Sequence, residues 1–159
     1  MNKTILVKTI LARLEAELEL YSISARAAHA EATHEQNKAE NKYDTRALEA
    51  SYLAHGQSRQ AAETEHARQY FEALIVRAFT PRDPIDLGAL VELENKGEHS
   101  FYFIGPKAGG TEVLCEGKEV LVITPQSPLG RELLGKMEGN SVMIGVAGAR
   151  NQFRIVSVR

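Results

Sequence analysis

Residues 127–136 read Ser-Pro-Leu-Gly-Arg-Glu-Leu-Leu-Gly-Lys, and this stretch is the clearest structural signal in the sequence. Ser127 is a favourable helix N-cap, because its hydroxyl can accept a hydrogen bond from an otherwise unpaired backbone amide. Pro128 suits the first helical position, where an amide donor is not needed. Gly135 can adopt the left-handed conformation that ends many helices. The stretch therefore predicts one short helix.

Six short runs of β-branched or aromatic residues surround this helix, and each is bounded by Gly, Asn or Pro. Such runs are typical of strands. They cover residues 90–93, 100–104, 111–114, 120–123, 141–146 and 153–158. The second half of the chain therefore predicts an α+β domain, in which an antiparallel sheet carries one short helix.

The amino-acid composition changes at residues 80–84, which read Thr-Pro-Arg-Asp-Pro. All five Pro and eleven of the twelve Gly lie from Pro81 onward, and only Gly56 precedes it. A half poor in Gly and Pro can form continuous helix, whereas two prolines interrupt helix and favour an extended link. We therefore expect two domains, at residues 1–80 and 81–159.

Hydrophobic residues in the first domain recur at steps of four and three, which is the pattern of a coiled-coil seam. The first set is Val7, Leu11, Leu14, Leu18, Tyr21, Ala25, Ala28 and Ala32, and the second is Leu48, Tyr52, Leu53, Ala61, Ala62, Phe71 and Leu74. Polar residues 36–43 separate the two sets. The pattern predicts an antiparallel helical hairpin with its tip near residues 36–44. The same periodicity would also suit a coiled coil that joins two chains.

Charge and cysteine content exclude several classes of protein. The formal net charge is −2, which argues against a protein held on DNA mainly by neutralising phosphates. Cys115 is the only cysteine, so neither an intramolecular disulfide nor a cluster of thiolate ligands can form in one chain. The sequence has no apolar run long enough for a membrane span and no recognisable signal core. We therefore expect a cytoplasmic protein without a membrane partner.

The stretch 127–136 resembles the signature of the C-terminal domain of the Gre-type transcript cleavage factors, the GreA/GreB family. That signature reads Ser-Pro-hydrophobic-Gly-x-Ala-Leu-hydrophobic-Gly-Lys, followed a few residues later by Gly-Asp. Here Glu132 replaces the usual Ala, and Gly139 with Asn140 replaces Gly-Asp. Two further runs resemble strands of the family in the same order, at residues 88–91 and 102–105.

The resemblance implies an FKBP-like C-terminal domain that docks at the secondary channel of bacterial RNA polymerase. It implies that the hairpin enters this channel and that acids at its tip help to place Mg²⁺ at the polymerase active site, where backtracked RNA is then cleaved. The factor would not itself be an enzyme, and would hold no cofactor or metal of its own. It would contact the nascent RNA 3′ end only indirectly, and DNA only through the polymerase.

Candidate tip acids are Glu40, Asp44 and Glu35. The Glu-Asn pair of the family tip aligns with Glu40 and its neighbour, but the family's Asp three residues earlier falls on Asn37. Mg²⁺ prefers anionic oxygens, so a neutral Asn would hold the ion less firmly. The alternative is that these acids only solvate a turn, where such residues are common.

Candidate polymerase-binding residues are Ser127, Pro128, Leu129, Gly130, Arg131 and Lys136. Two other functions remain open at this point. The altered tip at Asn37 would suit a non-cleaving secondary-channel regulator of transcription initiation. An FKBP-like fold would also suit a prolyl isomerase, although this half has few aromatic residues to wall a proline pocket, and a fold alone does not define an activity.

Overall fold

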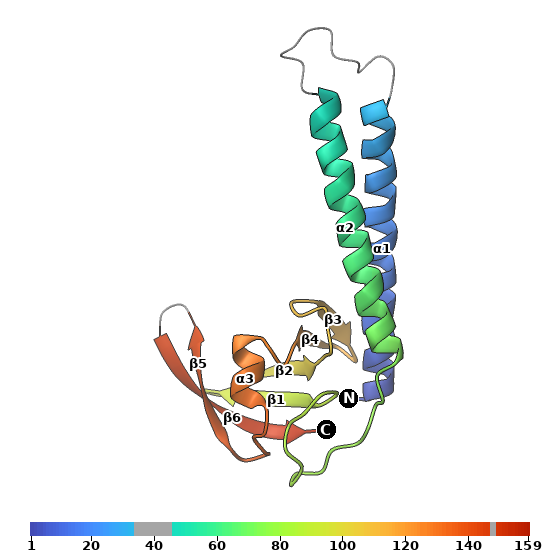
Figure 1. Ribbon diagram of the computed structural model, residues 1–159. Coiled ribbons are helices and arrows are strands. Elements are labelled where there is room, and N and C mark those ends of the chain that lie inside the picture. The colour runs from blue at the N-terminus through green and yellow to red at the C-terminus, as the bar shows by residue number, and fades with distance from the viewer. Residues whose placement is uncertain (34–45, 147–148) are drawn as a thin grey trace. The chain divides into compact units, whose positions relative to one another are not determined.

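The computed structural model describes residues 1–33, 46–146 and 149–159 (Figure 1). Two long helices are followed by six strands and one short helix. Their bounds are α1 Lys3–Thr33, α2 Arg46–Glu72, β1 Leu90–Asn95, β2 Glu98–Ile104, β3 Glu112–Cys115, β4 Lys118–Ile123, α3 Pro128–Leu133, β5 Ser141–Val146 and β6 Ala149–Val158. The predicted α+β class, the six strands and the short helix are confirmed. Among the described residues, no helix is both long and apolar enough to cross a membrane.

Backbone contacts divide the chain into two compact units. One unit joins Met1–Leu11 to Gln69–Arg159, and the other is Ala12–Arg68. The first unit contains the sheet together with the start of α1 and the end of α2, and the second contains the remaining length of both helices. Pro81 lies inside the first unit, and the expected domain boundary there stays a prediction.

In the helical unit, α1 and α2 run side by side as an antiparallel hairpin (Figure 1). The predicted seam of α1 is confirmed, because Leu14 and Ala28 are buried and Leu18, Tyr21 and Ala25 are half-buried. These side chains recur on one stripe of the helix, as a two-helix contact requires.

The predicted seam of the second helix is wrong at four of its seven positions. Leu48, Tyr52 and Leu53 are 54%, 70% and 54% exposed, and Ala62 is exposed as well. Phe71 is buried and Ala61 and Leu74 are half-buried, as predicted. The prediction missed three buried alanines, Ala50, Ala54 and Ala67. The distance between packed helices depends on the side chains at the contact, and alanine allows a close approach. Within the helical unit, the inner face of α2 is therefore formed by small residues rather than by its large apolar ones.

The six strands form one sheet in the order β3-β4-β2-β1-β6-β5. The expectation of a purely antiparallel sheet is wrong at one pair, because β2 and β4 run parallel, with Phe101 opposite Val120. After β2 the chain passes the position of β4 to form the edge strand β3, and β4 then returns between them. The connection begins at Gly105, where a Cβ atom would lie 2.7 Å from Val122 Cγ1 and 2.8 Å from Phe71 Cζ.

Each face of the sheet has its own core, because alternate residues of a strand point to opposite faces. One face packs Val91, Leu93, Ile104 and Ile155 against the fully buried Leu133 of α3. On the other face Phe103 packs against Phe71 at the end of α2, with ring centroids 6.3 Å apart. Two α1 residues of the same unit that the heptad pattern omitted, Leu6 and Ile10, are also completely buried.

The start of α1 is tied to the chain that precedes β1. Lys3 Nζ donates a hydrogen bond to the carbonyl of Gly88 at 3.1 Å and another to the carbonyl of Arg77. It also lies 4.6 Å from the centroid of the Phe79 ring, on which the Arg77 guanidinium stacks at 4.0 Å. Burial, and secondly the charge of Arg77, lower the pKa of Lys3 to about 8.

A polar cluster joins three neighbouring strands on the face of the sheet that carries Phe103. Glu92 Oε1 of β1 lies 2.9 Å from His99 Nδ1 of β2, and Ser157 of β6 donates a hydrogen bond to Glu92 Oε2 at 3.0 Å. Partial burial acts to raise the pKa of Glu92, but the hydrogen bonds from Ser157 and His99 and the charge of Lys118 outweigh it. The pKa of this carboxyl is therefore lowered.

Because the pKa of Glu92 is lowered in the folded state, its charged carboxylate stabilises the fold at pH values above the carboxyl's usual pKa of 4.5. This stabilisation is lost as the pH falls through the lower pKa of the folded state. We predict that Glu92→Gln lowers the free energy of unfolding most at neutral pH and progressively less toward low pH. Urea titrations at a series of pH values measure the difference. Glu98→Gln, at an exposed position on β2, is the control. A difference in unfolding free energy between Glu92→Gln and the wild type that stayed constant with pH would contradict the prediction.

Candidate functional site

The start of α3 is fixed by one serine. Ser127 Oγ accepts a hydrogen bond from the Gly130 amide at 3.0 Å and donates one to the Thr124 carbonyl at 2.8 Å. Pro128 occupies the first turn, as predicted. Because the hydroxyl is engaged on both sides, the cap joins α3 to the chain that leaves β4.

Gly130 is required by the space available. It is buried, and a Cβ atom at this position would lie 2.0 Å from the carbonyl oxygen of Thr124. No pair of unbonded heavy atoms approaches so closely, so a side chain would force α3 away from the end of β4. The glycine therefore sets how closely the helix packs against the sheet.

The end of α3 is held by backbone hydrogen bonds to the segment that precedes β1. Gly135 has a φ of 76°, as expected of a residue that ends a helix. Its amide donates to the carbonyl of Ile85 at 2.9 Å, and the amide of Ile85 donates to the carbonyl of Lys136 at 2.7 Å. Ile85 itself is 1% exposed. Both ends of this short helix are thus fixed by neighbouring parts of the same unit.

The turn after α3 explains the Asn that stands where the family signature has Asp. Asn140 Oδ1 accepts a hydrogen bond from the Met137 amide at 2.9 Å, and Gly139 has a φ of 87°. Aspartate and asparagine both offer a side-chain oxygen for such a turn. The exchange therefore preserves the hydrogen bond.

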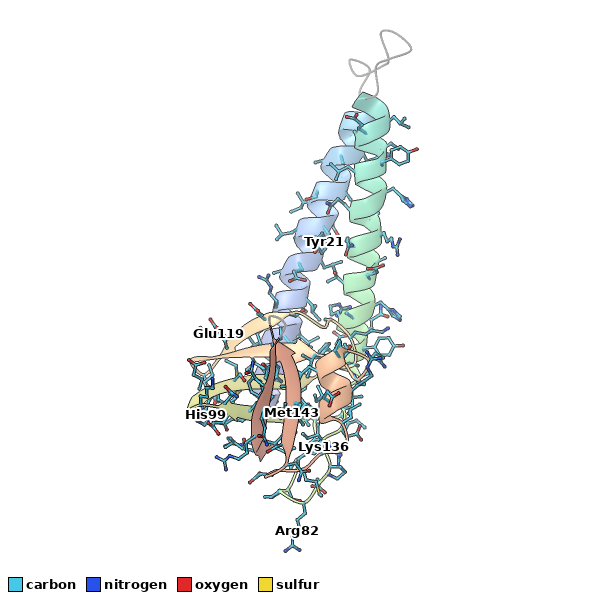
Figure 2. All side chains as sticks on the ribbon, turned by 90° about the vertical axis from the view of Figure 1, so that its left-hand side faces the viewer. Tyr21, Arg82, His99, Glu119, Lys136 and Met143 are labelled. Atoms are coloured by element: carbon cyan, nitrogen blue, oxygen red, sulfur yellow. The ribbon has the colours of Figure 1, made fainter. Side chains whose placement is uncertain are left out.

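A groove of about 540 Å³ lies between α3 and the strands β4 and β5. Its lining residues are Leu121, Ile123, Ser127, Pro128, Leu129, Glu132, Met143, Ile144 and Gly145. The lining is mostly apolar, and Glu132 is its one charged residue. Met143, labelled in Figure 2, is 48% exposed. Clefts of this size and composition are typical of binding sites, and exposed apolar surface often marks a partner interface. We call this feature the α3 groove.

The candidate binding residues do not all lie in the α3 groove. Ser127, Pro128 and Leu129 form its α3 wall. Gly130 is buried and supports that wall, whereas Arg131 and Lys136 are exposed and outside the lining (Lys136 is labelled in Figure 2). The structure therefore brings three of the six residues to one surface.

Sequence reasoning missed the opposite wall of the groove, which consists of Leu121 and Ile123 on β4 and of Met143, Ile144 and Gly145 on β5. One local signal was available. In the run Val142-Met143-Ile144 no residue is polar, although β5 is an edge strand of the sheet. An apolar residue on the outer side of an edge strand indicates a covered or binding surface.

The candidate tip acids Glu35, Glu40 and Asp44, together with Asn37, lie outside the described residues. Their chemistry can be stated from their identity alone. Carboxylates are hard anionic ligands suited to Mg²⁺, and the amide oxygen of Asn37 is neutral.

A family model described as "Transcription elongation factor, GreA/GreB, C-term" matches residues 80–159, which is half of the chain. The protein belongs to the GreA/GreB family of transcription elongation factors. The matched region contains the whole sheet, α3 and the α3 groove. No curated protein sequence matches the chain.

Solved structures with similarity to the chain carry related names. GreA factor homolog 1 of Thermus thermophilus is 24% identical, covers 94% of each chain and gives a TM-score of 0.40. The homologous protein of Thermus aquaticus is 25% identical, covers 92% of each chain and gives 0.41. A GreA/GreB elongation factor from Nitrosomonas europaea is 21% identical over 74% of this chain and 94% of its own, with a TM-score of 0.38.

Gly130→Ala should destabilise the sheet unit by about 3 kcal/mol, because the new methyl group displaces α3 from Thr124. Gly56→Ala is the matched control. A Cβ atom at Gly56, inside α2, would meet nothing within 4 Å, so this change should stabilise the protein by about 0.5–1 kcal/mol. Denaturant unfolding of both variants measures the two effects. Wild-type stability in Gly130→Ala would contradict the packing argument.

Proposed function

We propose that this protein binds bacterial RNA polymerase through the α3 groove, and that its helical hairpin enters the secondary channel and promotes cleavage of backtracked RNA by the polymerase. One observation carries the proposal. The segment with the Gre signature, residues 127–136, forms a wall of an apolar groove that none of the described residues of the chain fills. When a partner covers such a surface, apolar area is removed from water and the free energy of the complex is lowered.

The groove has the properties of a docking site. Pro128, Leu129 and Ile144 offer apolar side chains from two elements that are each held in place, one by the hydrogen bonds at both ends of α3 and the other by the sheet. Preformed surfaces bind with little ordering cost. A few such apolar anchors commonly supply most of the binding energy of an interface.

The two helices of the hairpin are long. Helix α1 has 31 residues and α2 has 27. At 1.5 Å per residue, α1 is roughly 45 Å long, which is more than the diameter of a small domain. A narrow pair of helices of this length can carry residues at its tip deep into a channel of a large enzyme.

The tip carboxylates of Glu40, Asp44 and Glu35 supply the chemical part of the proposal. A second Mg²⁺ at the polymerase active site stabilises the attacking and leaving oxygens when a phosphodiester bond is hydrolysed. The role of this protein is to add one or two anionic oxygens to a metal held mainly by the polymerase. In this proposal the protein is not an enzyme by itself and has no cofactor of its own. It acts on the RNA 3′ end only indirectly, and any DNA contact is made through the polymerase. A cytoplasmic location follows from the same partner.

The cleavage step is tested with backtracked transcription complexes. We predict that the wild-type protein shortens the RNA, and that joint Glu40→Ala and Asp44→Ala substitution slows cleavage at least about tenfold without weakening polymerase binding, since a lost metal ligand typically costs that much. Glu19→Ala, an exposed acid on α1, is the control. Wild-type protein that binds but leaves the RNA length unchanged would remove the cleavage step. Measurements of initiation would then test the non-cleaving regulator.

The docking step is tested by polymerase binding. Ile144→Asp places a charge in the apolar groove, on the face of β5 that α3 covers, and should weaken binding by about tenfold or more. Ile75→Asp is the control, because Ile75 is 83% exposed and does not line the groove. Unfolding curves establish that both variants are folded. Equal affinities for Ile144→Asp and the wild type would exclude the groove as the docking surface.

A further inference from the structure

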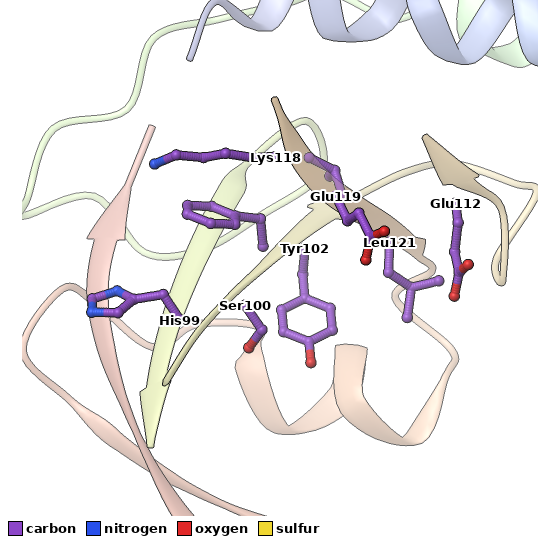
Figure 3. Close-up of a pocket in the computed structure, with 9 residues that line it drawn as sticks. His99, Ser100, Tyr102, Glu112, Lys118, Glu119 and Leu121 are labelled. Atoms are coloured by element: carbon purple, nitrogen blue, oxygen red, sulfur yellow. The ribbon is translucent and has the colours of Figure 1, made fainter. Parts of the chain in front are cut away.

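A second hollow of about 410 Å³ adjoins the α3 groove (Figure 3). It is lined by β2, β3 and β4, and Leu121 lines both hollows. Leu121 lies opposite Tyr102 on one side and opposite Glu112 on the other. Opposed residues of neighbouring strands point to the same face of a sheet. The two hollows therefore form one continuous surface across Leu121.

The second hollow is acidic. Glu112 and Glu119 are both exposed, and Glu119 shares the face of Leu121 because it lies two positions earlier on β4. Figure 3 shows the two carboxylates on the side of Tyr102 and Leu121, while Lys118 extends away from them. Lys118 Nζ instead lies 4.4 Å from the centroid of the Phe101 ring. We call the surface around Glu112 and Glu119 the acidic end of the groove.

These carboxylates are not neutralised by the part of the chain that the structure describes. Neither Glu112 nor Glu119 forms an ion pair with another described residue, and the same holds for Glu132 in the α3 groove. A partner that covered them without supplying positive charge would desolvate carboxylates at a considerable cost. A partner that binds favourably over these carboxylates must therefore supply cationic groups opposite them.

We propose that the occupant of the groove is a basic, amphipathic segment of the polymerase, which places an apolar side chain over Leu121 and the α3 groove and Lys or Arg side chains against Glu119 and Glu112. This inference rests on the proposed function for the identity of the partner. It adds which residues select the docking segment. The apolar part supplies affinity, and the acidic end supplies orientation and specificity, as charges at an interface rim generally do.

The same charges exclude another class of occupant. A nucleic-acid strand presents a continuous row of phosphates, and its binding sites are normally basic. Glu112, Glu119 and Glu132 would repel such a strand along the whole groove. The surface is thus specific for a polypeptide of positive charge.

Binding to core RNA polymerase at several ionic strengths tests the inference. Glu119→Lys should weaken binding about tenfold at low salt, and Glu119→Gln by a smaller factor, because like charges then face each other in the first variant only. The wild-type affinity should fall as salt screens the attraction. Glu98→Lys is the matched control, since it makes the same change of net charge at an exposed position of the sheet unit that lines neither hollow and should leave binding within about twofold.

Zero-length carbodiimide cross-linking supplies an independent readout, because it joins a carboxylate directly to a lysine amine. A cross-link from the wild type to a polymerase lysine should disappear in Glu119→Gln. The outcomes separate the two proposals. If the wild type does not bind polymerase, the proposed function fails. If Ile144→Asp weakens binding while Glu119→Lys behaves as Glu98→Lys does, docking stands and the basic-segment inference is overturned. Binding that strengthens with salt would overturn it as well.

Discussion

The close packing of α3 against the end of β4 is the constraint on which the candidate site depends. There is no room for a side chain at Gly130, because its Cβ would lie 2.0 Å from the Thr124 carbonyl oxygen. The Ser127 hydroxyl bonds to that same carbonyl. Both contacts hold the helix at one distance from the sheet, and this distance determines the width of the groove between Pro128 and Ile144. The shape of the groove is thus set by a backbone contact and a helix cap rather than by its apolar lining.

The signature segment therefore combines two kinds of residue. Ser127, Gly130 and Gly135 have complete structural explanations in the cap, the close contact and the left-handed helix end. Pro128 and Leu129 present apolar surface to the groove, and their local structure alone does not explain that exposure. Membership of the GreA/GreB family rests on this half of the chain.

Much of the fold could be predicted from sequence because its signals are local. The cap at Ser127 and the alternating runs that became strands depend on neighbours within a few residues. The parallel pairing of β2 with β4 could not be predicted, since it depends on where a later strand returns. The inner face of α2 was missed at Ala50, Ala54 and Ala67, because a seam of alanines has a weak hydrophobic pattern beside Leu48, Tyr52 and Leu53. The β4 and β5 wall of the groove was missed for the same reason as the pairing, and the tip acids lie outside the described residues.

The grouping of Met1–Leu11 with the sheet has a consequence for biosynthesis. Leu6 and Ile10 are synthesised well before β6, yet the unit in which they are buried also needs that strand. Contacts between segments far apart in a chain form slowly, because a long loop must be ordered first. The sheet unit therefore cannot complete its core until β6 has been synthesised. The helical unit, Ala12–Arg68, precedes most of the sheet unit in the chain and is free to fold before it.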